Sequence, residues 1–301
     1  MTLSPPSLVR IGEPGAPLVG APVDAPTGPP SAVEPDWRER LAHLRATLAE
    51  LGSVVVAYSG GVDSSLLLRV AHEVLGARAR GVIGRSDSYA TRELELALAQ
   101  ARAFGAQVEV VSTGELSDPN FRSNPTRRCY FCKRELYREL AAVAQRVGAA
   151  AVLDGTIADD LADFRPGRDA AAEGRVRSPL AELGFRKAQV RAAAAHYGLA
   201  SRAKPASPCL ASRIPYGTEI TREILSMVER GEELLRELGF AELRLRHHGE
   251  VARIEVPPGS LARLIEPGVR ERVVAGLKAL GYRYVTLDLE GFRSGSLNPG
   301  K

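Results

Sequence analysis

A short loop rich in serine and glycine has the residue types that best suit phosphate binding. Residues Ala57-Tyr58-Ser59-Gly60-Gly61-Val62-Asp63-Ser64-Ser65 follow the apolar run Val54–Val56 and precede Leu66–Leu68. This order predicts a buried strand, a tight loop and a helix start, whose unpaired N–H groups and positive dipole end attract an anion. Gly60 and Gly61 permit close approach of the backbone. The hydroxyls of Ser59, Ser64 and Ser65 add donors.

The acidic residue inside this loop suggests a metal ion. Asp63 alone would repel phosphates, but a bound Mg²⁺ that bridges them would reverse that effect, so Asp63 is a candidate magnesium ligand. The alternative is an aspartate stabilised by the dipole at a helix start. No Gly-Lys-Ser/Thr sequence follows the loop, which excludes a Walker-type site. An ordinary glycine-rich turn remains the structural alternative for the whole segment.

Two of the three cysteines have CxxC spacing. Cys129 and Cys132 lie just before a helix expected over residues 133–147. This pattern is typical of metal sites, iron–sulfur clusters and redox pairs, although a coincidental pair of small buried residues would look the same. The basic residues around the pair favour thiolates: they are Arg127, Arg128, Lys133 and Arg134.

The third cysteine lies in a loop that prolines fix. Cys209 follows Pro205 and Pro208 and precedes Arg213. A thiol beside a cation in an irregular loop suits a reactive cysteine, whereas a buried structural thiol is the alternative. Together, the three thiols could ligate three irons of a cubane cluster and leave the fourth iron open.

Further polar residues follow predicted strands. Arg244 and Arg246 alternate with leucines, so both point to one strand face, where they would suit a phosphate or a carboxylate or would simply be solvated. His247 and His248 are expected to be surface turn residues. After another apolar strand, Gly155 and Thr156 are expected to approach a nucleotide. Asp159 and Asp160 are expected to cap the next segment.

The elements that must position these residues alternate between strand and helix. Strands are expected at 53–57, 80–84, 107–111 and 150–153, and helices at 37–51, 64–75, 90–104, 133–147 and 187–197. This order predicts a doubly wound, mostly parallel α/β sheet. Ligands bind beyond the carboxyl ends of such strands, so the Ser59 loop, Ser86–Tyr89 and Gly155–Asp160 should share one rim.

The chain divides into three predicted regions. Residues 1–35 hold nine of the 20 prolines and are expected to be a disordered tail. Residues 36–215 form the α/β domain. Residues 216–301 form a small α+β domain for substrate binding or oligomerisation, with a helix at 221–238, a hairpin of residues 243–256, a helix at 260–280 and a strand at 284–289.

Size and composition exclude several classes of protein. No apolar stretch approaches the ~20 residues that span a bilayer, and the first residues lack the pattern of a secretory signal. Three cysteines cannot form a closed disulfide framework. We therefore expect a cytoplasmic protein. The 40 basic and 36 acidic residues nearly balance, so no nucleic-acid or membrane partner is expected.

Several motifs together resemble one enzyme family. They are Ser59–Ser65, Asp154-Gly155-Thr156 with Asp159-Asp160, Arg165-Pro166-Gly167, Arg177-Ser178-Pro179-Leu180, Ser207–Arg213, Arg244–His248 and Asp288–Ser296. With these segments the chain resembles the LarE family over about residues 37–301. The Ser/Gly loop alone resembles the PP-loop of all ATP pyrophosphatases, including NAD synthetases, GMP synthetases and tRNA-thiolating enzymes. The later motifs are more specific.

The resemblance implies a fold and a reaction. The fold is that of adenine nucleotide alpha hydrolases. The reaction is ATP-dependent sulfur transfer: Mg²⁺-ATP adenylates a carboxylate of pyridinium-3,5-biscarboxylic acid mononucleotide and releases pyrophosphate. Sulfur then displaces AMP, and two cycles give the bisthiocarboxylate used for the nickel-pincer cofactor of lactate racemase. A mixed anhydride with AMP supplies the leaving group that a carboxylate lacks.

The resemblance also implies roles for individual residues. In one branch of the family the cysteine that matches Cys209 gives up its own sulfur and becomes dehydroalanine. The added Cys129 and Cys132 match a three-cysteine branch with a [4Fe-4S] cluster, whose open iron would carry the sulfur. We therefore expect the three cysteines to be cluster ligands, with sacrifice of Cys209 as the alternative. Arg213, Arg244 and Arg246 match positions at the substrate phosphate.

Other functions and partners follow from the same resemblance. A tRNA-thiolating enzyme or an amidoligase would share the loop, but the former needs a broad basic face and the latter has no use for three cysteines. A module that senses ATP without catalysis is a third alternative. Family members tend to form homo-oligomers, and the functional partners would be the other proteins of nickel-pincer cofactor synthesis.

Overall fold

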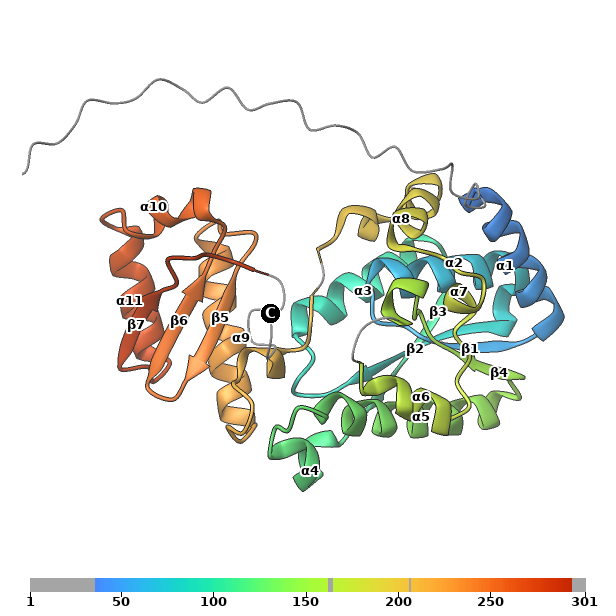
Figure 1. Ribbon diagram of the computed structural model, residues 1–301, viewed down its shortest axis with the longest axis horizontal. Coiled ribbons are helices and arrows are strands. Elements are labelled where there is room, and N and C mark those ends of the chain that lie inside the picture. The colour runs from blue at the N-terminus through green and yellow to red at the C-terminus, as the bar shows by residue number, and fades with distance from the viewer. Residues whose placement is uncertain (1–35, 162–164, 206, 294–301) are drawn as a thin grey trace, which may run out of the picture. The chain divides into compact units, whose positions relative to one another are not determined.

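The computed structural model describes residues 36–161, 165–205 and 207–293, with elements labelled as in Figure 1. The tail predicted over residues 1–35 lies outside these ranges, as does Ser294-Gly295-Ser296 of the closing motif. Within the described ranges, no helix has the length and apolar character needed to cross a membrane.

The α-helices are α1 (Trp37–Leu51), α2 (Val62–Leu75), α3 (Thr91–Ala103), α4 (Pro119–Arg122), α5 (Arg128–Val147), α6 (Gly167–Glu173), α7 (Pro179–Glu182), α8 (Lys187–His196), α9 (Arg222–Glu237), α10 (Leu261–Leu264) and α11 (Val269–Ala279). The strands are β1 (Val54–Ala57), β2 (Ala79–Arg85), β3 (Gln107–Ser112), β4 (Ala151–Leu153), β5 (Arg244–His248), β6 (Val251–Glu255) and β7 (Tyr284–Leu287). Short 3₁₀ helices are η1 (Gly76–Arg78), η2 (Glu115–Ser117), η3 (Ala158–Leu161), η4 (Ala200–Ala203), η5 (Leu210–Arg213) and η6 (Pro258–Ser260).

Four parallel strands form the larger sheet, in the order β3-β2-β1-β4. All four residues of β1 are buried, as expected for an apolar strand that is covered on both faces. The strands predicted from the sequence are confirmed, and each end lies within one residue of its expected position.

Helices cover both faces of this sheet. Val54 and Val56 of β1 pack in one core with residues of α1, α2, α3 and α8, whereas Val55 packs in a second core with α5 and α6. Alternate side chains of a strand point to opposite faces, so the two cores lie on opposite sides of the sheet, as Figure 1 shows. The predicted doubly wound α/β class is confirmed.

Helix α5 begins earlier than the sequence pattern predicts. The apolar stripe starts near residue 133, but the helix starts at Arg128. The buried Arg128 side chain donates to Asn124 Oδ1 at 2.6 Å, and its N–H donates to the Pro125 carbonyl at 3.0 Å. These polar contacts fix a turn that hydrophobic periodicity does not reveal. Cys129 and Cys132 therefore lie on the first turn of α5, not before it.

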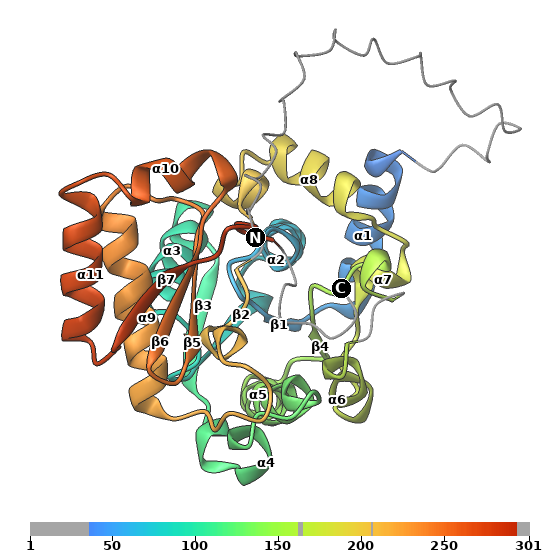
Figure 2. The same ribbon diagram turned by 60° about the vertical axis from the view of Figure 1, so that its left-hand side comes forward.

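The last third of the described chain forms a smaller mixed sheet, in the order β5-β6-β7. The expected hairpin is confirmed, because β5 and β6 are antiparallel, whereas β7 pairs with β6 in parallel. Residues of α9 and α11 pack with this sheet in one core that includes Leu235, Leu245 and Leu277 (Figure 2). This is the small α+β arrangement expected from the sequence.

The helix predicted at 260–280 is wrong in one respect, because it is two helices. α10 ends at Leu264 and α11 begins at Val269. Between them lies Pro267, which has no backbone donor to continue a helix, followed by Gly268 with φ of 79°. The periodic leucines and valines on both sides hid this break.

A fourth apolar cluster joins residues from both sides of position 215. It contains Phe121, Leu210, Ala211, Ile214, Ile220, Leu225 and Val228, with Cys132 and Cys209 packed against it. The domain boundary between residues 215 and 216 therefore stays a prediction. The cluster supports the positions of two of the three cysteines.

The packing of the apolar face of α5 against the larger sheet should stabilise the fold. Leu140 is fully buried, so Leu140→Ala should lower the free energy of unfolding by about 2–5 kcal/mol through lost burial and a cavity. Leu96→Ala is the control, because 45% of Leu96 is exposed and its replacement should change stability by less than about 0.5 kcal/mol. Denaturant unfolding measures both, and equal losses would contradict this packing.

Candidate active site

The Ser/Gly loop joins β1 to α2 as the sequence predicts. Gly60 has φ of 68°, and a Cβ at this position would lie 2.5 Å from Ala97 Cβ, so only glycine fits. The Ser59 and Ser64 hydroxyls lie 3.1 Å apart and share a hydrogen bond. No side chain caps the first turn of α2, which is the arrangement that a helix start needs to receive an anion, and we call the loop with this turn the cradle.

Ser65 does not belong to this cradle, which corrects the expectation for its hydroxyl. Its side chain is fully buried, and its Oγ accepts a hydrogen bond from Gln100. Its N–H donates to the Gly61 carbonyl at 2.9 Å. Ser64 and Ser65 are both buried residues of α2, and two consecutive serines gave no sign that the second hydroxyl is enclosed.

The loop after β4 lies directly against the first turn of α2. A Cβ on Gly155 would lie 2.8 Å from the Ser64 backbone nitrogen, so glycine permits this contact. The preceding Asp154 is buried and accepts hydrogen bonds from Tyr137 Oη at 2.8 Å and Ser178 Oγ at 2.7 Å. These bonds fix the loop in place. The expected neighbourhood of the Ser59 and Gly155 loops is confirmed.

The turn after β2 completes this rim. Tyr89 Oη donates to the Ser59 carbonyl at 2.9 Å, and the Ser88 carbonyl accepts from the Leu210 N–H at 2.9 Å. The Ser86–Tyr89 turn therefore contacts both the Ser/Gly loop and the residue that follows Cys209. The rim predicted from the ends of the parallel strands is confirmed, and it extends to the cysteine loop.

Asp63 lies at the start of α2 with a partner that the sequence did not suggest. Both of its carboxylate oxygens accept from Lys187 Nζ, each at 2.7 Å. Burial raises the pKa of Asp63, Lys187 opposes that shift, and the nearby Asp160 adds to it. Lys187 is separated from Asp63 by 124 residues and belongs to no motif, so no local signal could have found this ion pair.

Two aspartates were expected to cap the segment that follows them, but the structure gives such a role only to Asp159 and not to Asp160. Asp160 accepts from the Ile157 N–H at 3.1 Å and so caps the segment in which it lies. Asp159 instead accepts from the Lys187 N–H at 2.7 Å and caps the start of α8. Both carboxylates therefore help to fix the part of the rim that holds Lys187.

The structure brings the three cysteines together from two distant segments. Cys129 and Cys132 occupy the first turn of α5, and Cys209 precedes η5. Cys132 and Cys209 pack against the same apolar cluster. Each thiol of the CxxC pair interacts electrostatically with Cys209. We call these three residues the thiol cluster.

The expected lowering of the thiol pKa values is wrong for the CxxC pair. Although Cys129 is exposed as a residue, desolvation raises the pKa of its thiol, and Cys209 adds to the rise against Arg128 and Lys133. Burial raises the pKa of Cys132 strongly, and Glu115 and Cys209 raise it further. Desolvation therefore outweighs the neighbouring cations, which argues against a redox pair of reactive thiolates.

The thiol cluster does not form a site for a single metal ion in the part of the chain that the structure describes. Among residues 36–161, 165–205 and 207–293, no three His, Cys, Asp or Glu side chains are arranged to hold one metal ion. The sulfurs around one zinc must each lie about 2.3 Å from it, whereas in an iron–sulfur cluster each cysteine binds a different iron. Beside Cys132, Glu115 has a buried Oε2 that no described residue hydrogen-bonds, so the site has unused ligand capacity.

Arg213 is the centre of a buried polar network. Its side chain is only 2% exposed and forms a bidentate ion pair with Glu232 at 2.8 and 3.0 Å. It also donates to the carbonyls of Pro208 at 2.6 Å and Cys209 at 3.1 Å. Burial would raise the pKa of Glu232, but Arg213 and Arg236 hold it below its usual value. Arg213 therefore holds the cysteine loop.

Arg246, like Arg213, forms a buried ion pair with a glutamate. Arg244 differs in that burial lowers its pKa. Arg246 is 5% exposed and forms a bidentate pair with Glu255 at 2.8 and 2.9 Å. Arg244 lies over the Phe292 ring at 4.9 Å. Burial, followed by the charge of Arg213, lowers the pKa of Arg244 to about 10 against the opposing effect of Glu232. The three predicted phosphate-binding arginines lie near one another, but the structure gives Arg213 and Arg246 carboxylate partners.

The sequence analysis missed both glutamates of these pairs and misplaced one histidine. Glu232 lies on α9 among other glutamates, and Glu255 alternates with apolar residues of β6, so neither pattern distinguishes them from surface residues. His247, expected at the surface, is buried and lies 3.3 Å from Tyr282 Oη. The wide apolar core of the smaller sheet encloses it.

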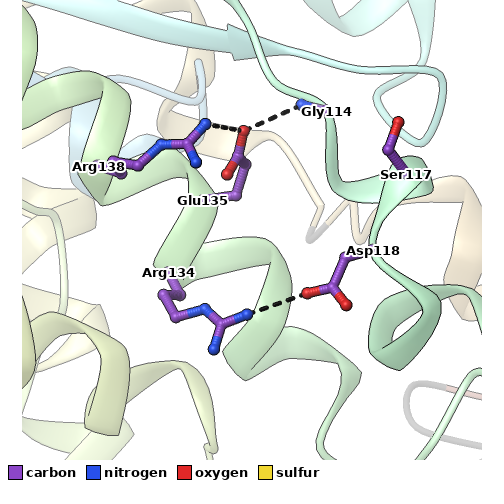
Figure 3. Close-up of a pocket in the computed structure, with 6 residues that line it drawn as sticks. All are labelled: Gly114, Ser117, Asp118, Arg134, Glu135 and Arg138. Atoms are coloured by element: carbon purple, nitrogen blue, oxygen red, sulfur yellow. Dashed lines mark hydrogen bonds and ion pairs between the residues drawn. The ribbon is translucent and has the colours of Figure 1, made fainter.

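Two cavities border this region. One, of about 750 Å³, opens between η2 and α5 and is lined by Gly114, Ser117, Asp118, Arg134, Glu135 and Arg138 (Figure 3). Its arginines form ion pairs with Asp118 at 3.0 Å and Glu135 at 2.7 Å, and it contains none of the predicted site residues. A second, smaller cavity reaches Cys209 and Arg213 and is also lined by Tyr89, Arg92 and Arg236. Only the second cavity adjoins the candidate chemistry.

Similarity to known proteins agrees with this arrangement. No family model matches the sequence. A pyridinium-3,5-bisthiocarboxylic acid mononucleotide synthase of Lactiplantibacillus plantarum is 41% identical over 258 residues, which cover 85% of this chain and 93% of that protein. An uncharacterized protein of Synechocystis is 46% identical over 259 residues, 86% of this chain and 97% of its own. A glutamine-hydrolyzing GMP synthase component of Pyrococcus horikoshii is 28% identical over 138 residues, 42% of each chain.

Fold, loop and similarity together define an enzyme with a doubly wound α/β sheet and a Ser/Gly loop like that of the ATP pyrophosphatases. Within that class, the identity to the Lactiplantibacillus synthase over almost its full length assigns the family. The chain belongs to the LarE family of sulfurtransferases.

The burial of Asp63 predicts an unusual pH dependence of stability. Because its folded-state pKa is raised above the unfolded value, the ionised carboxylate disfavours folding at neutral pH, and this cost disappears as the pH falls. Asp63→Asn should therefore match or exceed the thermal midpoint of the wild type at neutral pH. The difference should shrink toward about pH 4. A variant with a lower thermal midpoint than the wild type at neutral pH would show that the Lys187 ion pair outweighs burial.

Proposed function

We propose that this enzyme uses ATP to activate the carboxylates of pyridinium-3,5-biscarboxylic acid mononucleotide and converts them to thiocarboxylates. The product would be the sulfur-containing precursor of a nickel-pincer cofactor, as made for lactate racemase. The synthase of Lactiplantibacillus, which shares 41% of its residues with this chain, carries the name of that product. The observation that supports the proposal in this molecule is that the Ser86–Tyr89 turn contacts both the Ser/Gly loop and the Cys209 segment.

The first step would take place at the Ser/Gly loop. The N–H groups at the start of α2 and the hydroxyls of Ser59 and Ser64 would bind the phosphates of ATP. A carboxylate oxygen of the substrate would attack the α-phosphorus, and pyrophosphate would leave. Asp63 is the residue that would hold Mg²⁺, which would offset charge on the phosphates. Lys187, on the same carboxylate and 43% exposed, would offer the phosphates a second cation.

The second step would take place near Cys209. Sulfur would attack the activated carbonyl, and AMP would leave as the thiocarboxylate forms. Arg213 would keep the cysteine loop in place through the Pro208 and Cys209 carbonyls. Arg244, which the family resemblance matches to the substrate phosphate, would contact that phosphate, and an anion there would offset the burial that lowers its pKa. Arg246 would support it through the buried Glu255.

Two sources of sulfur are compatible with this site. In the first, Cys129, Cys132 and Cys209 bind a [4Fe-4S] cluster, which would supply an iron without a cysteine ligand for an exchangeable sulfur. The proximity of the three thiols supports it, and raised thiol pKa values agree with cysteines that lose their protons only on metal binding. In the second, Cys209 gives up its own sulfur. The CxxC pair has no part in that alternative, so the cluster is favoured.

The remaining proposals concern location and partners. We expect this enzyme to work in the cytoplasm as a homo-oligomer together with the other proteins of nickel-pincer cofactor synthesis. The near balance of 40 basic and 36 acidic residues supports a small nucleotide rather than tRNA as substrate.

Pyrophosphate release tests the first step. Wild-type enzyme with Mg²⁺-ATP should release pyrophosphate and AMP only when the biscarboxylic mononucleotide is present, which excludes a sensor. Gly155→Ala should reduce this rate by about a hundredfold, because its Cβ would lie 2.8 Å from the Ser64 nitrogen and displace the cradle. Gly259→Ala is the matched control, since open space surrounds that glycine. Release without the substrate would contradict the proposal.

Anaerobic iron and sulfide analysis with the visible spectrum tests the source of sulfur. The wild type should contain about four irons per chain and absorb broadly in the visible range, and Cys129→Ala should lose both. A colourless wild type after anaerobic reconstitution would overturn the cluster. Mass spectrometry should then find dehydroalanine at position 209 after one turnover.

A further inference from the structure

A buried carboxylate faces the thiol cluster from an element that lacks any recognised motif. Glu115, the first residue of η2, is 2% exposed. Its Oε1 accepts from Ser88 Oγ at 3.0 Å and lies 4.0 Å from Cys132 Sγ, within hydrogen-bonding distance for sulfur. Its Oε2 is buried and accepts no hydrogen bond from any residue that the structure describes. One oxygen is therefore oriented, and the other is available.

Glu115 lacks the arginine partner that the other two buried glutamates have. Glu232 and Glu255 are equally buried, and each forms a bidentate pair with an arginine. In the described part of the chain, neither a lysine nor an arginine forms an ion pair with Glu115, and its Oε1 accepts from the Cys132 thiol at 4.0 Å. A buried carboxylate without a cation is costly, so a positive ligand would relieve that cost.

We propose that Glu115 is the fourth protein ligand of the iron–sulfur cluster in the resting enzyme. This inference rests on the cluster of the proposed function, where Cys129, Cys132 and Cys209 account for three irons. Carboxylate oxygens are established iron ligands, and the contact with Cys132 puts Glu115 beside a cluster-binding sulfur. An oxygen ligand is replaced more readily than a thiolate, so this position would stay exchangeable for sulfur.

Ser88 is the residue that orients this ligand. It donates through Oγ to Glu115, while its carbonyl accepts from the Leu210 N–H next to Cys209. One residue therefore fixes the carboxylate and the cysteine loop with respect to each other. Such hydrogen bonds to a ligand usually contribute about 10–100-fold to metal affinity.

The test compares the loss of one iron from three reconstituted full-length proteins. Wild type, Glu115→Gln and Glu135→Gln are loaded anaerobically, and their iron and sulfide contents are measured. A mild oxidant with a chelator then removes the iron that lacks a cysteine, and the EPR signal of the three-iron cluster reports the rate. Glutamine can still accept from Ser88 and from a thiol, but it is a poor iron ligand. Glu135 is the control, because it lies next to η2, accepting from Gly114 N–H and pairing with Arg138 (Figure 3).

Glu115→Gln should lose its fourth iron at least about tenfold faster than the wild type, whereas Glu135→Gln should match the wild type. Equal rates in all three proteins would overturn the ligand and leave the cluster in place. Absence of iron from wild type and control after reconstitution would overturn the cluster and the ligand with it. Should Glu115→Gln fail to fold, Ser88→Ala must raise the rate in the same direction, and an unchanged rate there would also overturn the proposal.

Discussion

Two residues after β2 hold together the parts of the rim that carry chemistry. Tyr89 bonds the Ser59 carbonyl, and Ser88 bonds both the Leu210 N–H and Glu115. At the carboxyl ends of parallel strands the backbone groups leave the sheet without strand partners, so a turn there can bind whatever segment arrives. The Ser/Gly loop is local to one strand and one helix. The thiols come from segments far away in sequence, and this turn contacts both the Ser/Gly loop and the Cys209 segment.

The charges of the buried arginines fix the positions of neighbouring groups through ion pairs within the protein. Taking an ion pair out of water costs about as much as the pair regains, so the pairs of Arg213 with Glu232 and Arg246 with Glu255 are weak evidence for stability. Their geometry is their contribution, since a bidentate fork fixes a guanidinium plane. The guanidinium of Arg213, held in this way, donates hydrogen bonds to two carbonyls of the cysteine loop and so fixes that loop. Arg244 has the same type of side chain but stacks on Phe292, and an anion beside it would offset the burial that lowers its pKa.

What the sequence predicts well is local, and what it misses joins distant segments. The strands of the larger sheet are buried on both faces, so their apolar runs define them almost to the residue. The Gly60 loop follows from neighbours in the chain. The partners of Asp63 and Arg213 do not, because Lys187 and Glu232 lie 124 and 19 residues away and their burial results from packing. The early start of α5 depends on Arg128 and Asn124, whose polar contacts leave no periodic signal. The sign of the thiol pKa shifts was missed for the same reason: charge is visible in a sequence, but desolvation is not.

Lys133 offers a physical reason for placing thiols and phosphates so close together. It lies one turn after Cys129 on α5, and the neighbouring Tyr137, followed by Asp154 and Cys132, raises the pKa of its ammonium despite burial. Asp154 fixes the loop against the phosphate cradle, and Cys132 belongs to the thiol cluster, so one cation interacts with both halves of the site. Bound phosphates and thiolates would each add negative charge, and like charges at this distance would repel. The Lys133 ammonium interacts with groups of both halves and so offsets part of that negative charge.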